Sequence, residues 1–397
     1  MKKLLALVLA ACLLMTVVPA FATVADTVAA SENLTHDELV EKAKAEEGTF
    51  IVYGNTSRIS TAAENFSKLY DIPFESNNLK DAEIYTKLES EIKGSAKGAD
   101  MVMIQDGAQL TYAIEDGWVV NYVPASVKDT VGESDRNPLV HQYINKLFIY
   151  NKLGENVPAI KNVWELTAPE MKGNIIFKNP ENETVNMNFL VMLTSDENAA
   201  KMADAYKAYY GTDIVLDSDC PNAGYQWIKM MYQNGAVLGD SDGDIAKAIG
   251  NPEQESDTKW SALITLNKYI KNRKDSTKNP GNYTLDYVKE MDPVAGFIYP
   301  IYGLITKNAD NPELAKAFLV WLFTEEGWVG DGTTTQRDGS VYKGMSGRMG
   351  DYSGNQSLAV TEGDLPVTEW KKILIQEDPI YAAAHRADVE DFIKLIK

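Results

Sequence analysis

Thr49 to Tyr70 read TFIVYGNTSRISTAAENFSKLY, a strand that runs through a polar turn directly into an amphipathic helix. Residues 50–53 are all β-branched or aromatic, and Gly54 ends the run, as expected for a short buried strand. From Ile59 onward, apolar residues recur at the spacing of one helix face. We therefore expect a strand–turn–helix unit here, which is the building block of an α/β sheet.

The turn of this unit holds four polar residues that we take as candidate ligand-binding residues: Asn55, Thr56, Ser57 and Arg58. They lie between the carboxyl end of a strand and the amino end of a helix, where open α/β sheets bind ligands. Free backbone N–H groups and the positive end of the helix dipole favour an anion at such a place. The alternative is that Thr56 or Ser57 only caps the helix. This segment by itself leaves both interpretations open.

The same alternation of strands and helices continues along the chain. Thr35 and Glu38 have the spacing of a capping box and predict a short helix. Further strands are predicted at residues 98–104, 143–150 and 172–178, and further helices at residues 84–92, from 105–107 onward, 185–193 and 314–323. This regular alternation of strands and helices indicates βαβ units and a largely parallel sheet. Residues 330–354 are rich in Gly, Thr, Ser and Asp, which predicts a long surface loop.

The first 22 residues have the pattern of a secretory signal peptide. Lys2 and Lys3 precede an apolar run, and the Ala-Phe-Ala of residues 20–22 matches a signal-peptidase site. Residues 9–12 also resemble a lipoprotein box, in which Cys12 would be lipidated. Because the apolar run continues past Cys12, we favour cleavage after Ala22. We expect residues 23–34 to be a flexible leader, and the chain to be exported to the periplasm or the extracellular face of the membrane.

Composition narrows the function classes. The chain has 57 acidic and 38 basic residues, a net charge of −19, which argues against nucleic acid or an anionic membrane as a partner. After processing, Cys220 would be the only cysteine, so no internal disulfide can form. The three histidines (His36, His141 and His385) lie in dissimilar contexts, and no common catalytic or nucleotide-binding motif occurs. We therefore expect no enzyme, no cofactor and no metal site.

Four stretches together resemble the extracellular solute-binding proteins of ABC importers, specifically the iron(III)-binding type of the family-1 group. They are VYGNTS at residues 52–57, GADMVMIQDG at residues 98–107, WEL at residues 164–166 followed by KGNI at residues 172–175, and NPELAKAFLVWLFTEEG at residues 311–327. The resemblance runs from about Gly48 to about Gly327, and its last stretch is the most specific.

This resemblance implies a two-lobed periplasmic-binding-protein-like α/β fold of type II. In such a fold two crossover strands form a hinge, and the ligand is held in the cleft between the lobes. We place the crossovers near residues 146–151 and 295–306. The first lobe would then comprise residues 35–145 and 296–345, and the second lobe residues 146–295 and 346–397.

The resemblance also implies a ligand shell built from loop ends that face the cleft. To the four turn residues it adds Gln105 and Asp106 from the next strand end, and Thr184 and Asn186 from across the cleft. Asp242 and Tyr299 are weaker candidates that complete the set. Helix capping would equally explain Thr184 and Asn186, and core packing would explain Tyr299.

The same residues bear on the class of ligand. Iron-binding members of this family often use a histidine after the first strand and a neighbouring tyrosine pair, because Fe(III) prefers hard oxygen ligands. Here Asn55 follows the strand, and the adjacent tyrosines, Tyr209 and Tyr210, lie in a predicted helix away from the cleft. With Arg58 beside a helix start, the turn favours a small oxyanion or a phosphorylated or carboxylated compound. Ferric iron is one alternative, and a polyamine held by Asp106, Asp242 and an aromatic wall is another.

The sequence thus predicts a monomeric extracytoplasmic solute-binding protein that hands a small polar ligand to a membrane ABC permease. Two other classes stay open. One is a secreted enzyme built on the same lobes, and the other is a sensory binding protein that feeds a receptor instead of a permease.

Overall fold

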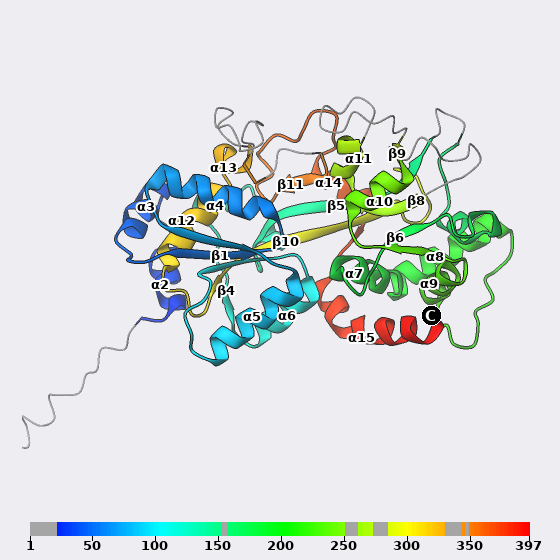
Figure 1. Cartoon of the computed structure of the whole chain (residues 1–397), viewed down its shortest axis with the longest axis horizontal. Helices are drawn as coiled ribbons and strands as arrows, with labels where there is room; N and C mark the ends of the chain where they lie inside the picture. Colours follow the sequence, from blue (N-terminus) through cyan, green and yellow to red (C-terminus); the bar gives the residue numbers. More distant parts are fainter. Residues whose placement is uncertain (1–21, 153–156, 251–260, 273–284, 330–343, 346–348) are drawn as a thin grey trace, which may run out of the picture.

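The computed structural model describes residues 22–152, 157–250, 261–272, 285–329, 344–345 and 349–397. The expected signal peptide, apart from Ala22, lies outside the described residues, and so does Cys12. The described residues form an elongated α/β molecule with helices on both sides of a long sheet (Figure 1). None of the helices in these residues is long and apolar enough to cross a bilayer.

One large mixed sheet runs through the length of the described structure. Its strand order is β11 (Asp351–Ser353), β5 (Val140–Asn151), β10 (Gly296–Thr306), β3 (Met101–Ile104), β1 (Phe50–Gly54) and β2 (Phe74–Asn78). Four shorter strands join it: β4 (Val119–Val120) and β12 (Ile375–Gln376) pair with β10, and β8 (Ser261–Thr265) and β9 (Leu285–Tyr287) pair with β5. A separate pair is formed by β6 (Ile176–Lys178) and β7 (Val237–Gly239). The prediction of a largely parallel sheet was wrong, because β5 and β10 form mostly antiparallel pairs.

The half at the left of Figure 1, which we call lobe 1, is built on the parallel strands β1, β2 and β3. The predicted strand–turn–helix unit is confirmed as β1 followed by α4 (Ser57–Tyr70), whose apolar stripe around Ile59 and Phe66 is buried. The other helices of this half are α2 (Val24–Ala30), α3 (His36–Lys44), α5 (Asp81–Lys93), α6 (Gly107–Glu115), α12 (Pro312–Leu322) and α13 (Glu325–Val329). The apolar faces of α2, α3, α4, α12 and α13 form one hydrophobic core around α12, whereas α5 and α6 bury their apolar residues in other clusters.

The half at the right of Figure 1, which we call lobe 2, surrounds the parallel pair of β6 and β7. Its helices are α7 (Thr184–Leu193), α8 (Asp196–Tyr210), α9 (Ala223–Gln233), α10 (Asp242–Ile249) and α11 (Leu266–Asn272). Trp164 and Trp227 are fully buried here, and each indole N–H donates to a backbone carbonyl, at 2.8 Å and 3.1 Å. The core is therefore well packed, with the polar atoms of both indoles satisfied.

Two long antiparallel strands connect the halves. One end of β10 pairs with β3 in lobe 1, and the rest pairs with β5. The second half of β5 pairs in turn with β8 and β9. They are the strands expected at residues 146–151 and 295–306, although β5 begins six residues earlier, at Val140. The two-lobed type II architecture is thereby realised, while the lobe boundaries given above remain a proposal.

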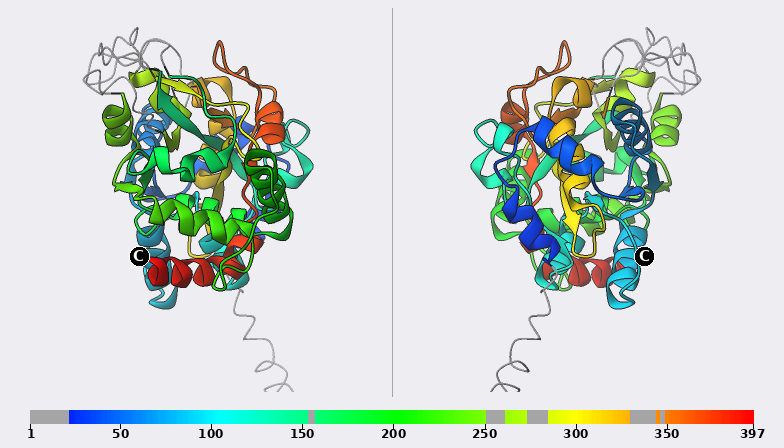
Figure 2. Two further views of the ribbon diagram at one scale, coloured as in Figure 1. Left: turned by 90° about the vertical axis from the view of Figure 1, so that its right-hand side faces the viewer. Right: turned by 90° about the vertical axis from the view of Figure 1, so that its left-hand side faces the viewer.

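The C-terminal segment consists of α14 (Val367–Ile373), β12 and α15 (Pro379–Ile396). The long helix α15 packs against α6 of lobe 1 and against α7 and α9 of lobe 2. The end views of the molecule show α15 along one edge, next to the helices of lobe 1 (Figure 2). The chain therefore has a third connection between the halves besides the two crossover strands.

Two expectations for loop-like segments were wrong. Residues 23–34, expected to be a flexible leader, contain α2, which begins with a Thr23–Asp26 capping box and packs on α12. Ser31 is buried and donates to Glu313 at 2.8–2.9 Å, so this small, polar segment is held by a distant helix. Likewise, part of the loop expected at residues 330–354 is β11, which is buried because it pairs with β5; residues 330–343 and 346–348 lie outside the described residues.

Candidate ligand-binding site

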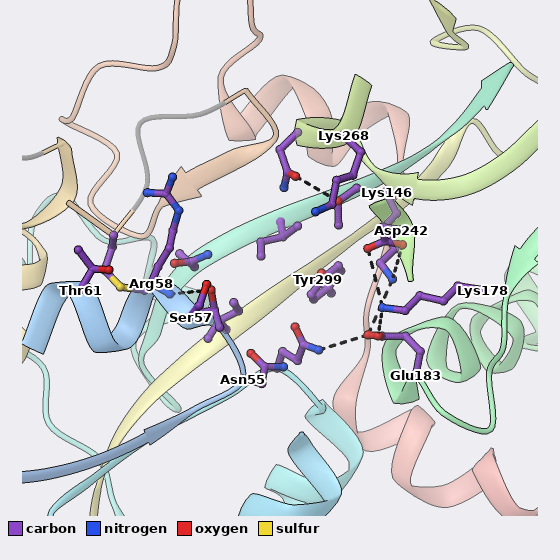
Figure 3. A pocket seen from close by; sticks show the side chains of 18 of the residues that line it. Asn55, Ser57, Arg58, Thr61, Lys146, Lys178, Glu183, Asp242, Lys268 and Tyr299 are labelled. Carbon is purple, nitrogen blue, oxygen red and sulfur yellow. Dashed lines mark hydrogen bonds and ion pairs between the residues drawn. The ribbon is translucent and has the colours of Figure 1, made fainter. Parts of the chain in front are cut away.

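A polar cavity of about 530 Å³ lies where the ends of the strands and helices of both lobes meet (Figure 3). Lobe 1 contributes the β1–α4 turn and the end of β3, and lobe 2 contributes the end of β6 and the starts of α7, α10 and α11. The crossover strands β5 and β10 form its floor. This volume is within the range of small-molecule sites in proteins. The residues that line it are Asn55, Thr56, Ser57, Arg58, Thr61, Gln105, Gln142, Ile144, Lys146, Lys178, Glu183, Asp242, Thr265, Asn267, Lys268, Tyr299, Ile301, Gly344 and Met345.

The lobe 1 wall carries a cation, hydroxyls and amides. Thr56 is the N-cap of α4, and its hydroxyl accepts from the backbone N–H of Arg58 at 3.3 Å. The capping interpretation is thus correct for Thr56, while exposed Ser57 lies free to face the cavity at the helix start. The Arg58 guanidinium donates to the Gly344 carbonyl at 3.2 Å. Asn55 donates to Asp81 at 2.8 Å, which orients its amide at the rim.

The lobe 2 wall carries a cluster of two lysines and two carboxylates, which we call the charge cluster: Lys146, Lys178, Glu183 and Asp242. The Lys146 Nζ atom lies 3.8 Å from Glu183 Oε1 and 3.9 Å from Asp242 Oδ1. The Lys178 Nζ atom contacts Glu183 Oε2 directly and lies 3.9 Å from Asp242 Oδ2. Figure 3 shows the four side chains around a common centre. Each lysine therefore has a carboxylate partner inside the cluster.

Burial and charge act against each other in this cluster. The Lys146 side chain is only 1% exposed, and burial lowers its pKa despite Asp242 and Glu183. Burial also opposes the charged forms of Lys178 and Glu183, but the attraction of Asp242 and Glu183 for Lys178, and of Lys146 and Lys178 for Glu183, is stronger. As a result, the pKa of Lys178 lies above its ordinary value and that of Glu183 below. Lys178 and Glu183 thus stay charged and can attract a polar ligand.

Tyr299 lies on β10 at the floor of the cavity and is 2% exposed. Burial, with the nearby carboxylates Glu183 and Asp242, raises the pKa of its phenol well above the ordinary value. The phenol is therefore neutral without a ligand, and binding a ferric ion would require it to lose its proton. Tyr209 and Tyr210 lie at the end of α8 and are not part of the cavity lining.

The structure brings together most of the residues that the sequence singled out. Of the ten candidates, seven line the cavity: Asn55, Thr56, Ser57, Arg58, Gln105, Asp242 and Tyr299. Thr184 lines an adjoining cavity of about 450 Å³, which shares Asn55, Gln105 and Glu183 with the first. Asn186 is fully buried behind the wall, where its amide oxygen accepts from Lys146.

Asp106 has a different environment from the one expected. It is fully buried as the N-cap of α6 and forms an ion pair with Arg386 of α15. Its carboxylate therefore serves the contact between α6 and α15 and is not among the lining residues.

Sequence reasoning missed the cations on the lobe 2 side, namely Lys146, Lys178 and Lys268. A signal for Lys146 was present, because a lysine directly before the apolar run from Leu147 to Tyr150 of a predicted strand needs a partner in the fold. No comparable signal marks Lys178 or Lys268, which lie at element ends where lysine is common.

The fold and the cleft cavity define a two-lobed ligand-binding protein of the type II periplasmic class. The sequence model of the bacterial extracellular solute-binding protein family matches residues 63–328, about two-thirds of the chain, and the chain belongs to this family. The resemblance inferred from the four sequence stretches is thereby confirmed. None of the curated protein sequences compared with the chain matches it.

Solved structures of similar fold agree with this assignment. The ferric binding protein from Campylobacter jejuni has a TM-score of 0.61 at 16% identity over 87% of this chain and 99% of that one. Iron-bound HitA from Pseudomonas aeruginosa has a TM-score of 0.60 at 14% identity, with 88% and 99% covered. AfuA from Actinobacillus pleuropneumoniae, with exogenous fructose-6-phosphate bound, has a TM-score of 0.60 at 16% identity, with 88% and 98% covered. At such identity these likenesses establish the fold alone.

Proposed function

We propose that this protein captures a small anionic solute between its lobes and delivers it to a membrane ABC permease. The observation that carries the proposal is an inversion of charge. The chain as a whole has a net charge of −19, yet the described residues that line its cavity include four basic side chains and two carboxylates. Walls of one predominant sign concentrate ligands of the opposite sign. The cations are Arg58, Lys146, Lys178 and Lys268.

The distribution of groups supports an organic oxyanion over a bare inorganic ion. The wall of lobe 1 presents Arg58 and the start of the 14-residue helix α4, which suit a phosphate or carboxylate group. The rest of the lining offers amides, hydroxyls and the internally paired charge cluster, which suit the polar remainder of a ligand. A volume of about 530 Å³ leaves room for such a remainder. We therefore favour a phosphorylated or carboxylated compound.

The cavity supports the alternative ligands less well. Several structural neighbours are ferric binding or iron-bound proteins, but here the buried phenol of Tyr299 is the only tyrosine in the described lining. Both lining carboxylates already interact with lysines. A polyamine would meet an excess of positive charge and a lining with no tryptophan among the described residues.

Transport follows from closure of the cleft. A ligand that contacts both lobes has a higher affinity for the closed form and shifts the equilibrium toward it, and no bond is made or broken.

We further propose export with cleavage after Ala22, in preference to a lipid anchor at Cys12, and a monomeric state without a nucleic acid partner. A secreted enzyme or a sensory component would use the same lobes, and turnover of a bound compound or docking on a receptor would reveal either.

A thermal-shift screen of the chain from Thr23 onward tests the proposal. The panel comprises inorganic phosphate, sugar phosphates, phosphonates, ferric citrate and polyamines. A ligand at a hundred times its dissociation constant adds about 2.7 kcal/mol to the free energy of unfolding. We expect a saturable shift with organic phosphates or carboxylates. A shift confined to ferric citrate or to polyamines would refute the anion assignment and retain the fold.

A further inference from the structure

Helix α15 is held to both lobes by polar contacts as well as by packing. On the side of lobe 1, the Tyr112 hydroxyl of α6 donates to the Ala383 carbonyl at 2.8 Å. On the side of lobe 2, the hydroxyls of Thr194 and Tyr381 lie 3.3 Å apart. The helix also packs on α6, α7 and α9 (Figures 1 and 2). The last helix of the chain thus spans the division between the lobes.

Four polar side chains meet where α15 crosses this division, and we call them the hinge junction: Asp106, Asn188, Glu377 and Arg386. The Arg386 guanidinium binds Asp106 of lobe 1 through both terminal nitrogens, one of them at 2.8 Å, and also donates to Asn188 of lobe 2. The amide of Asn188 donates to Asp106 at 3.3 Å and to Glu377. Asp106 and Asn188 are each 0% exposed. A single guanidinium, on a side chain that is 14% exposed, therefore joins two fully buried residues of the two lobes.

The hinge junction is also closely packed. Gly107 opens α6 beside it, and a Cβ atom at that position would lie 2.8 Å from both Glu377 Oε2 and Pro379 Cβ. The chain before α15 is fixed as well, because the Glu377 N–H donates to the Ile298 carbonyl of β10 at 3.1 Å. The start of α6, a crossover strand and the start of α15 therefore converge at one point.

These contacts restrict how the lobes can move. Separating a buried ion pair leaves a carboxylate and a guanidinium desolvated without partners, which is strongly destabilising. Ligand-driven closure is limited to the difference in ligand affinity between the two forms. We propose that the hinge junction stays intact while the cleft opens and closes, so that Arg386 is a fixed pivot for the rotation of the lobes. This inference goes beyond the proposed function and depends only on the two-lobed fold.

The pivot has a consequence for the ligand site. Asp106, which Arg386 holds, directly follows Gln105, which lines the cavity. Arg386 is therefore a positioning residue for the strand end that carries Gln105, without touching the ligand itself. Rotation about this point widens the mouth of the cavity while the opposite side, at α15, keeps its spacing.

Pulsed EPR distances in the ligand-free chain from Thr23 onward test the pivot. Cys220→Ser removes the remaining native thiol, and spin labels are placed on exposed helix positions. The mouth pair is Lys68 on α4 with Lys247 on α10, and the pivot pair is Glu115 on α6 with Gln233 on α9. We expect a broad distance distribution for the mouth pair and a narrow one for the pivot pair. Arg386→Ala should at least double the width for the pivot pair, and Arg386→Lys should broaden it less.

Lys394→Ala is the matched control, because it removes from the same helix an exposed cation that pairs with Asp391 at 2.9 Å. It should leave both distributions unchanged. If Arg386→Ala does not fold, Asn188→Ala removes the lobe 2 side of the hinge junction and is measured in the same way. A pivot pair as broad as the mouth pair in the parent protein would overturn the proposal. So would an unchanged pivot pair in the folded junction variant.

Discussion

Gln105 donates a hydrogen bond of 3.3 Å to Glu183 and so connects the end of β3 in lobe 1 to the residue before α7 in lobe 2. Glu183 belongs to the charge cluster as well, since it contacts Lys178 and lies 3.8 Å from Lys146. One carboxylate thus lies close to two lysines and accepts a hydrogen bond from the opposite lobe. Glu183 therefore contributes both to the charge of the cavity and to the contact between the lobes.

Glu183→Gln should weaken the fold and strengthen anion binding at the same time. The loss of a carboxylate beside buried Lys146 should lower the free energy of unfolding by about 1–3 kcal/mol, measured by urea denaturation. The same loss makes the cavity more positive, and we expect affinity for an anionic ligand to rise by about tenfold in calorimetry. Glu181→Gln is the control, because Glu181 is exposed and pairs with Lys397. Weaker anion binding in the Glu183 variant would contradict an anion site beside the charge cluster.

Arg58→Ala should weaken binding of an anionic ligand by roughly 1.5–3 kcal/mol, the usual contribution of a hydrogen bond to a charged group. Isothermal titration with the compound found in the thermal screen measures the loss. Lys68→Ala removes a cation from the exposed end of the same helix and should leave the affinity unchanged. An unaltered affinity in the Arg58 variant would remove Arg58 from the site.

The stability of the protein should fall as the pH rises from 6.5 to 8. Burial and the neighbouring Asp106 raise the pKa of Asp81 to about 7 and that of Glu377 to about 8. The folded state therefore retains protons that the unfolded state has already released, and this contribution is lost as the pH rises through the folded-state values. His141 has the opposite sign, because burial lowers its pKa to about 3, but its effect ends at its ordinary value of 6.5.

Of these three groups, only Asp81 and Glu377 still change the free energy of unfolding with pH above pH 6.5. The slope should reach at most about 1.4 kcal/mol per pH unit for each carboxyl group. Urea denaturation at pH 6.5, 7.2 and 8 measures it. In Glu377→Gln the decline should be shallower, and a stability that increases over this range would show that these carboxyls are ionised in the fold.

Ser31→Ala should lower the free energy of unfolding by about 1–3 kcal/mol, although Ser31 lies in a segment that the sequence marks as a leader. The Ser31 hydroxyl contacts Glu313 and Lys316, and the Lys316 side chain is 0% exposed and also donates to the Val28 carbonyl at 3.1 Å. Asn33→Ala, at an exposed position two residues later, is the control. Equal stability of the two variants would indicate that α2 contributes nothing to the fold.

Local patterns were sufficient wherever a few consecutive residues decide the structure. Residues 50–70 specify a buried strand, a capped turn and an amphipathic helix. The signals for these elements are the spacing of the apolar residues, the strand break at Gly54 and the helix cap at Thr56, and each depends only on residues close by in the sequence. The same holds for α12, which begins at Pro312 and is apolar through most of its length. The family resemblance depends on the order of such units, and for this reason the sequence determined the two-lobed fold and the rim at residues 55–58.

Only the tertiary structure decided the charge of the site and the environment of its neighbours. The charge cluster joins residues between positions 146 and 242, and the partner of Asp106 is Arg386, 280 positions away. A carboxylate looks the same in the sequence whether it faces a ligand or a buried arginine. Its role depends on which distant side chains the fold brings within a few ångströms, because electrostatic energy depends on distance and burial and not on separation along the chain.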